Sequence, residues 1–289
     1  MSAASDFAWE EATLAGLASA FDDGSLTARA LTASYLARIE AMDGAGPELR
    51  SVIEINPDAL EIADALDGER RGGHLRGPLH GVPILVKDNL DTADRMHTTA
   101  GSLALVDARP RRDAPVIERL RAAGAIVLGK TNLHELSFGW TSNNLAFGAV
   151  HNPFDTKRIP GGSSGGTAVA IAAHMAPLGV AEDTEGSIRV PAALCGISGF
   201  RPTTGRYPTH GCVPISPLFD QVGPHARTVS DLALFDSVVA NDGHSLQPTS
   251  LKGLRFGVVR EYFFTDLDPE VERLTNLALE RLKDSGAEI

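Results

Sequence analysis

Apolar side chains recur every three or four positions in the first 45 or so residues. That spacing gathers apolar groups on one face of a helix, so two helices are predicted there. The apolar positions are Leu14, Leu17, Ala18 and Phe21 in the first helix and Leu31, Tyr35, Leu36 and Ile39 in the second. The polar stretch 22–24 separates them, and Thr27 is the expected N-cap of the second. We expect both helices to pack on the outside of the main domain.

From residue 51 onward, short apolar runs alternate with segments of helical periodicity. Strands are predicted at 52–55, 82–86, 125–128, 178–180 and 254–259, and helices at 58–67, 114–123 and 167–175. Strands that alternate with helices favour an α/β fold, because each helix carries the chain back to a neighbouring strand. We therefore predict a mixed, largely parallel central β-sheet covered by helices on both faces.

The chain shows no fixed-period repeat and no low-complexity linker, so a single domain over 1–289 is predicted. It comprises N-terminal helices over about 1–45, a core over about 50–245 and an incomplete C-terminal part. An amphipathic helix at 268–284 leads into Gly286-Ala287-Glu288-Ile289, which has the pattern of a strand entry. A sheet element that stops at its first residues would leave an unpaired edge, so a C-terminally truncated chain is expected.

Composition narrows the function classes. With 43% hydrophobic residues, the 289-residue chain can bury a sizeable core. Its net charge of −11 gives no general attraction to nucleic acid or anionic membranes. Cys195 and Cys212 form neither a disulfide framework nor a zinc motif, and the start of the chain has no secretory pattern. The longest stretch of small apolar residues, 167–181, is too short and too interrupted to span a membrane. A cytoplasmic protein is expected.

The run Gly161-Gly162-Ser163-Ser164-Gly165-Gly166 is the first candidate for chemistry. A flexible loop is the plain interpretation, but a helix of small residues follows, and glycines at a helix start leave N–H groups open to an anion. The run lacks the Gly-Lys-Ser/Thr ending of a phosphate loop. It matches the G-x-S-x-G elbow of α/β-hydrolases, yet the polar, proline-bounded segment 152–160 precedes it instead of a buried strand. His210 and His225 remain candidate partners for that interpretation.

Lys87 and Ser187 could complete a catalytic group with this run. A serine hydroxyl needs a neighbouring base, and two serines with one lysine supply nucleophile, relay and base without a histidine. Lys87 ends an apolar strand, where burial would favour the uncharged amine. Alone, however, it is typical of a solvated lysine, and Ser187 of an ordinary turn. Asp183 and Arg189 flank Ser187 and are expected to form a buried pair that fixes this turn.

The ordered set of motifs resembles the amidase signature family from the N-terminal helices to the last residue. The matching blocks are Gly81-Val82-Pro83-Ile84-Leu85-Val86-Lys87-Asp88-Asn89, Gly129-Lys130-Thr131-Asn132, Pro160-Gly161-Gly162-Ser163-Ser164-Gly165-Gly166, Gly186-Ser187-Ile188-Arg189-Val190-Pro191-Ala192-Ala193, Gly199-Phe200-Arg201-Pro202-Thr203 and Asp220-Gln221-Val222-Gly223-Pro224. The segment 200–208 is similar to the mandelamide and indoleacetamide hydrolase branch. The glutamyl-tRNA amidotransferase A-type chain usually carries Gln where Val190 stands.

The resemblance implies a Ser-Ser-Lys triad: Ser187 as nucleophile, Ser163 as relay on a cis peptide bond and Lys87 as base. It implies an oxyanion hole from the backbone N–H groups of Thr184, Glu185, Gly186 and Ser187. Ser164, Asp183 and Arg189 are implied as supporting residues. The implied reaction passes through an acyl-serine and needs no metal or organic cofactor.

Two positions depart from the family pattern. The family usually has Gly where Glu185 stands and Thr where Glu182 stands. The Glu185 carboxylate would either oppose the developing oxyanion or point away and contribute only its N–H. Family members are also usually much longer, and we expect the substrate pocket to take residues from 138–144 and from segments outside this chain.

The leading hypothesis is an amidase that hydrolyses a small carboxylic amide, arylacetamides being one candidate class, to an acid plus ammonia or an amine. The alternatives are an A-type amidotransferase subunit that supplies ammonia to a charged tRNA, and an inactive or partner-dependent fragment. The expected partner is the small-molecule amide, without direct nucleic-acid or membrane contact. A homodimer is left open.

Overall fold

The computed structural model describes residues 8–243 and 248–289. The chain divides into two compact units, Met1–His244 and Ser245–Ile289. Each unit is described by itself, and the single domain over 1–289 stays a prediction. The larger unit contains the β-sheet and every residue of the predicted site.

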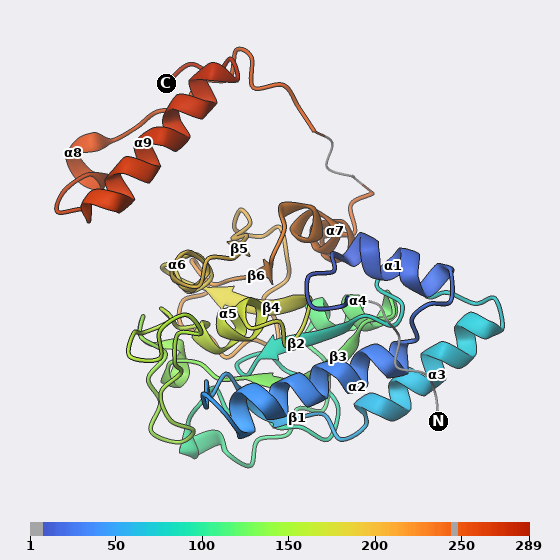
Figure 1. The fold of residues 1–289 in the computed structure, drawn as a ribbon. Coiled ribbons are helices and arrows are strands. Elements are labelled where there is room, and N and C mark those ends of the chain that lie inside the picture. Colours follow the sequence, from blue (N-terminus) through green and yellow to red (C-terminus); the bar gives the residue numbers. More distant parts are fainter. Residues whose placement is uncertain (1–7, 244–247) are drawn as a thin grey trace. The chain divides into compact units, whose positions relative to one another are not determined.

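The larger unit is built on a six-stranded sheet with the strand order β1-β3-β2-β4-β6-β5 (Figure 1). The strands are β1 Val52–Ile55, β2 Pro83–Lys87, β3 Ile126–Thr131, β4 Leu178–Asp183, β5 Ser198–Gly199 and β6 Gln221–Ala226. At the centre, β3, β2 and β4 run parallel, whereas β1 is antiparallel to β3, β6 to β4 and β5 to β6. The mixed α/β sheet is confirmed, and its parallel part is the centre.

Two crossover helices cover opposite faces of the parallel centre. Helix α4 (Pro115–Ala122) connects β2 to β3, and α5 (Gly165–Ala172) connects β3 to β4 on the other side of β2. These connections step across the sheet in opposite directions, so right-handed crossovers place their helices on opposite faces. Figure 1 shows α5 in front of the sheet and α4 behind it.

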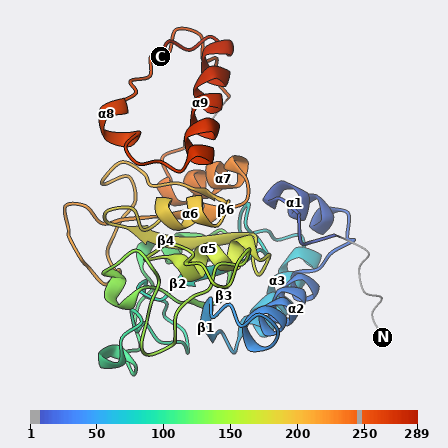
Figure 2. The same cartoon turned by 60° about the vertical axis from the view of Figure 1, so that its left-hand side comes forward.

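The two N-terminal helices are confirmed as α1 (Leu14–Asp22) and α2 (Ala28–Ile39). Thr27 is the N-cap of α2, because its hydroxyl accepts a hydrogen bond from the N–H of Ala30 at 3.1 Å. Helix α2 packs along α3 (Ala59–Arg71), as Figures 1 and 2 show. The remaining helical elements of this unit are the π-helical segment Glu40–Gly44, the 3-10 turns Leu103–Leu105 and Glu135–Ser137, α6 (Arg189–Leu194) and α7 (Val229–Ala240).

The apolar runs at 82–86 and 125–128 form the middle of the core. Side chains of β2 and β3 are buried on both faces, as expected for parallel strands covered by helices on each side. The strands continue beyond the apolar runs, so that Lys87, Thr131 and Asp183 end β2, β3 and β4. Because the carboxyl ends of neighbouring parallel strands meet at one edge, these polar residues converge at the place where α/β proteins commonly bind ligands.

The smaller unit contains α8 (Arg260–Phe263) and α9 (Pro269–Asp284), so the helix predicted at 268–284 is confirmed. The strand predicted at 254–259 is wrong. Arg255 forms only an isolated parallel bridge with Glu288, supported by two backbone hydrogen bonds of 2.8 Å. A strand needs a run of backbone partners, and this segment pairs with a single residue. Within 8–243 and 248–289, no helix has the length and apolar character needed to cross a bilayer.

Helix α7 is anchored by a buried carboxylate. Asp236 accepts hydrogen bonds from Arg206 at 2.7 and 2.6 Å and from the Tyr207 hydroxyl at 2.5 Å. The Arg206 hydrogen bonds hold the pKa of Asp236 below its ordinary value. We expect Asp236→Asn to lower the free energy of unfolding at pH 7 by about 1–3 kcal/mol.

This loss should depend on pH. A depressed carboxyl pKa stabilises the folded state above the unfolded pKa of about 4, and the effect disappears as the pH falls through the folded pKa. Urea unfolding at pH 7 and near pH 3 should therefore show a smaller difference between wild type and variant in acid. Asp64→Asn, which breaks an exposed contact with Arg29, is the control and should change stability little. An Asp236→Asn effect independent of pH would contradict the assignment.

Candidate active site

A buried lysine–serine contact lies at the carboxyl end of β2. Lys87 is fully buried, and its Nζ lies within hydrogen-bond distance of Ser163 Oγ, at 2.7 Å. The same Nζ lies 3.0 Å from Glu182 Oε2 and 3.3 Å from the Glu182 carbonyl oxygen. The side chains of Ser163 and Glu182 are also buried. The amine is therefore removed from water, so the solvated-lysine interpretation is wrong, and a carboxyl group lies beside it.

The glycine–serine run is an ordered loop, so the flexible-loop interpretation is wrong. The Gly162–Ser163 peptide bond is cis. The Ser142 side chain binds both ends of the loop. Its hydroxyl donates to the Gly161 carbonyl at 2.8 Å and accepts from the N–H of Gly165 at 2.9 Å. A Cβ atom on Gly162 would lie 2.8 Å from the backbone nitrogen of Ser142, so this close approach requires glycine.

Ser187 lies in the turn between β4 and α6 and is 3% exposed. Its carbonyl accepts a hydrogen bond from the N–H of Ser164 at 3.3 Å, which joins this turn to the glycine–serine loop. Ser164 Oγ donates to the Glu182 carbonyl at 3.0 Å. Among the described residues, no hydrogen bond connects the hydroxyls of Ser163 and Ser187 directly. The first link of the expected relay is therefore present, and the second is not closed in this structure.

Asp183 organises the Ser187 turn. Its carboxylate accepts from the N–H groups of Gly186 at 2.8 Å and Ile188 at 3.0 Å, and it pairs with Arg189 and Arg201 at 3.1 Å each. Burial raises the pKa of Asp183, but hydrogen bonds from Arg189 and the turn outweigh this effect, and the pKa lies below its ordinary value. The predicted Asp183–Arg189 pair is present, although the Arg189 side chain is 55% exposed and only Asp183 is buried.

The hydrogen bonds to Asp183 also remove one donor from the expected oxyanion hole. The N–H of Gly186 donates to Asp183 Oδ1 and is not free to bind an oxyanion in this structure, which corrects the prediction for that residue. The physical reason is the tightness of the turn, which folds the Gly186 amide back onto the carboxylate at the end of β4. Within the described residues, the N–H groups of Thr184, Glu185 and Ser187 have no backbone or side-chain acceptor and remain available.

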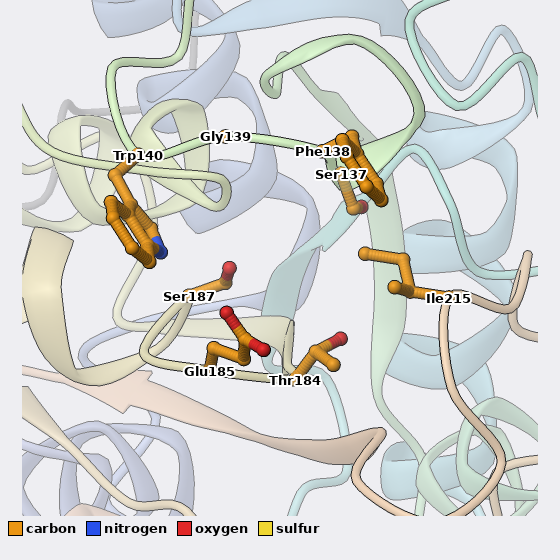
Figure 3. Close-up of a pocket in the computed structure, with 8 residues that line it drawn as sticks. All are labelled: Ser137, Phe138, Gly139, Trp140, Thr184, Glu185, Ser187 and Ile215. Carbon is orange, nitrogen blue, oxygen red and sulfur yellow. The ribbon is translucent and has the colours of Figure 1, made fainter.

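A pocket of about 300 Å³ opens beside Ser187. Its lining, drawn in Figure 3, consists of Ser137, Phe138, Gly139, Trp140, Thr184, Glu185, Ser187 and Ile215. The predicted segment 138–144 thus contributes three residues to the wall, of which Phe138 and Trp140 are exposed. By contrast, Ser142 and Asn144 are buried and form hydrogen bonds within the protein.

Glu185 has an ordinary backbone conformation without a positive φ, so a glutamate fits where glycine is usual. In Figure 3 its side chain points toward the Ser187 hydroxyl, and both residues line the pocket. Of the two orientations left open by the sequence, the structure has the carboxylate directed into the site.

Glu182 is the site residue to which sequence reasoning assigned no role. It is 1% exposed, and its Oε2 accepts from Lys87 and, at 3.2 Å, from Asn89 Nδ2. The available signal was the two-residue period of a strand, which turns Glu182 and Asp183 to opposite faces of β4. Only the fold reveals that the Glu182 face is the Lys87 face.

The two histidines do not form a hydrolase triad. His225 is buried, with Nε2 placed 2.8 Å from the Ile188 carbonyl, and burial lowers its pKa to about 4. His210 lines a separate hollow with Asp91 and Arg112. Within the described residues neither ring contacts a serine hydroxyl, and no strand leads directly into the glycine–serine loop. The α/β-hydrolase interpretation is therefore wrong.

Comparison with known proteins finds chains that are similar over almost all of this sequence. The chain is 44% identical to the A-type chain of the glutamyl-tRNA(Gln) amidotransferase of Chloroflexus aggregans and 43% identical to that of Halorhodospira halophila. These matches cover 95% and 96% of this chain but 59% of each relative. The chain thus spans less than two thirds of the length of these relatives.

Solved structures show the same fold. The peptide amidase of Stenotrophomonas maltophilia superposes with a TM-score of 0.88 at 39% identity, covering 97% of this chain and 62% of that one. The A-type chain of the Thermotoga maritima glutamyl-tRNA(Gln) amidotransferase superposes with a TM-score of 0.80 at 29% identity, covering 98% and 61%. The amidase family profile matches residues 30–289. On this match, and on its identity to these relatives, the chain belongs to the amidase family.

Proposed function

We propose that this protein hydrolyses a carboxylic amide through an acyl-serine formed on Ser187. The observation that carries the proposal is the buried 2.7 Å contact between Lys87 and Ser163, beside the pocket that Ser187 lines. An amine sheltered from water next to two serines provides a base and a proton relay for a hydroxyl nucleophile.

In the proposed reaction, uncharged Lys87 removes the proton of Ser163, which removes that of Ser187, and the Ser187 oxygen attacks the amide carbonyl. The tetrahedral oxyanion faces the available N–H groups of Thr184, Glu185 and Ser187. The proton returns along the relay to the leaving nitrogen, and water then hydrolyses the ester. The open link between the serine hydroxyls closes as substrate binds, because catalytic hydrogen bonds often tighten only in the complex.

The pocket favours a small amide with an apolar or aromatic group. Phe138 and Trp140 present exposed rings at its wall, and the volume of about 300 Å³ limits the size of the group. The proposal is tested by ammonia release from arylacetamides, amino-acid amides, C-terminal peptide amides and glutamine. Failure to hydrolyse any amide, by a chain with a cooperative melting transition, would contradict it.

A second candidate is the ammonia-supplying, A-type subunit of a glutamyl-tRNA amidotransferase. The relatives that carry that name, at 44% and 43% identity, are the observation in its favour. Val190 stands where such subunits usually have Gln, and the net charge of −11 gives no attraction to tRNA. Glutamine hydrolysis stimulated by partner subunits would support this function, whereas efficient turnover of aryl amides by the chain alone would favour the first.

The third hypothesis is that this chain is an inactive fragment, or one that depends on a partner for activity. Size-exclusion chromatography and thermal melting of the 289-residue chain test it, because a monodisperse and active species would contradict it. The same experiment determines whether the chain forms a homodimer.

We also propose a cytoplasmic location, where the free thiols of Cys195 and Cys212 would stay reduced.

The Glu185 carboxylate should restrain catalysis on neutral amides. It is exposed and points toward the Ser187 hydroxyl, where a negative charge opposes the developing oxyanion. We expect Glu185→Gln to raise kcat/KM for a neutral amide by about tenfold and to lower it for amides that carry a nearby ammonium group. Glu61→Gln, at an exposed position of α3, is the matched control. Equal changes for neutral and cationic substrates would contradict an electrostatic role.

A further inference from the structure

A chain of three polar side chains, Glu182, Thr184 and Asp220, leads from Lys87 away from Ser163. Glu182 Oε2 lies 3.0 Å from Lys87 Nζ, and Glu182 Oε1 lies 2.9 Å from the hydroxyl of Thr184. That hydroxyl lies 2.6 Å from Asp220 Oδ1. Glu182 is 1% exposed and Asp220 is 5% exposed, so both carboxyl groups are out of water.

The single hydrogen of the Thr184 hydroxyl determines whether one of the two neighbouring carboxyl groups is protonated. A threonine hydroxyl has one hydrogen, yet two carboxyl oxygens lie within hydrogen-bond distance of it. If both carboxyl groups were ionised, one of these short contacts would bring two lone pairs together. One carboxyl group must therefore carry a proton and donate it to the threonine oxygen.

Asp220 is the acceptor of the two. Its Oδ2 accepts from the N–H groups of Ile215 at 2.9 Å and Ser216 at 3.0 Å, and its Oδ1 accepts from Ser216 at 3.0 Å. A carboxylate whose two oxygens both receive backbone N–H bonds is stabilised in its ionised form. Thr184 then donates to Asp220, and the proton that Thr184 accepts comes from Glu182 Oε1.

The other oxygen of Glu182 has the contacts of a carbonyl. Oε2 receives Lys87 Nζ at 3.0 Å and Asn89 Nδ2 at 3.2 Å, and both are nitrogen donors. We propose that Glu182 is a carboxylic acid protonated on Oε1 and that it thereby keeps Lys87 an uncharged amine. The inference deepens the proposed function and rests on the assignment of Lys87 as the base.

The proton balance is complete. A proton that moves from the Lys87 ammonium to the Glu182 carboxylate turns a buried ion pair into an amine and a carboxylic acid, with no net charge gained or lost. The amine then directs its two N–H groups to the carbonyl oxygen and Oε2 of Glu182. Its lone pair faces Ser163 Oγ at 2.7 Å and can accept the Ser163 proton. Full burial favours this uncharged pair, because isolated charges are costly out of water.

The titratable neighbours of the pair include two uncharged groups and three carboxyl groups. Burial raises the pKa of the Cys212 thiol well above its ordinary value, and burial lowers the pKa of His225 on β6 to about 4, so both are uncharged at neutral pH. Asp183, on the opposite face of β4, is paired with Arg189 and Arg201. Asp220 and Asp91 are the other acidic groups near this cluster.

Infrared difference spectroscopy of the whole chain tests the proposal directly. We expect the wild-type spectrum at pH 7 to contain a carboxylic-acid C=O band that is absent from Glu182→Gln and present in Asp220→Asn. Loss of carboxylate bands alone in Glu182→Gln would overturn the proposal, as would a band that disappears only in Asp220→Asn. The ¹³C chemical shift of the Glu182 carboxyl group in wild-type protein gives the same answer without depending on a variant.

Activity provides a second readout. A glutamine amide has the contacts of the protonated acid, with its NH₂ toward Thr184 and its carbonyl toward Lys87. Glu182→Gln should therefore fold and leave the acidic limb of the pH–rate profile in place. An ionised Glu182 would instead hold Lys87 as an ammonium, and its removal would shift that limb to lower pH by about one unit or more. Such a shift, or failure of the variant to fold, would contradict the proposal.

The experiments distinguish failure of the proposed function, amide hydrolysis, from failure of the proposed protonation of Glu182. The infrared and NMR readouts need no turnover, so absence of amide hydrolysis would reject the proposed function and leave the proton assignment testable. Conversely, a chain that hydrolyses amides and lacks the acid band would keep the function and lose the inference.

Discussion

Replacing Ser187 with alanine is expected to reduce kcat for amide hydrolysis by about 10⁵-fold while leaving the fold intact. The side chain is 3% exposed at the wall of the pocket, and its hydroxyl is the only group that the proposed mechanism uses to form a covalent bond. Removing the Ser187 hydroxyl leaves the hydrogen bonds between Asp183 and the backbone of this turn unchanged. Stopped assays of ammonia release and a thermal melt of the same sample measure the two effects.

Ser34→Ala is the matched control for this variant. Ser34 lies on α2, where its hydroxyl donates to the Ala30 carbonyl at 3.0 Å, so its loss should leave kcat unchanged. Mass spectrometry of wild-type protein quenched during turnover should find the acyl group on the peptide that contains Ser187. Wild-type rates in Ser187→Ala, or an acyl group on another serine, would remove Ser187 from the mechanism.

Replacing Lys87 with methionine should lower kcat by about 10⁴-fold, because the relay loses its base. Methionine occupies a similar volume but cannot accept the proton of Ser163. The variant also removes nitrogen partners of buried oxygens, so the free energy of unfolding should fall by about 1–3 kcal/mol. Steady-state kinetics and urea unfolding on one preparation separate the loss of chemistry from the loss of stability.

Lys130 offers an unusually close control on the adjacent strand β3. It is also fully buried, and its Nζ donates to the Leu90 carbonyl at 2.7 Å and the Thr98 hydroxyl at 3.0 Å, with Asp88 3.6 Å away. Lys130→Met should cost comparable stability, yet the folded variant should keep kcat within about tenfold, because Lys130 has no contact with Ser163. Equal loss of activity in the two lysine variants would indicate damage to the sheet and would contradict a chemical role for Lys87.

Local pattern predicted most of the elements of the larger unit. The run 82–86 is apolar on both faces, which is what a central parallel strand requires, and it became β2. Thr27 could be recognised as an N-cap because capping depends only on neighbouring residues. β6 escaped prediction because Gln221–Ala226 contains glycine, proline and histidine and has no apolar period. Its backbone is extended because it pairs with β4.

The sequence by itself determined the candidate triad, through the motifs around Lys87, Ser163 and Ser187, and it determined the class of fold. Only the tertiary structure decided that the Gly186 N–H is occupied, that the Glu185 side chain points toward Ser187 and that Glu182 contacts Lys87. The reason is separation along the sequence. Capping and hydrophobic periodicity act over a few residues, whereas the Lys87–Ser163 and Lys87–Glu182 contacts join positions 76 and 95 residues apart. Which polar groups meet across such distances depends on the order in which the strands pack.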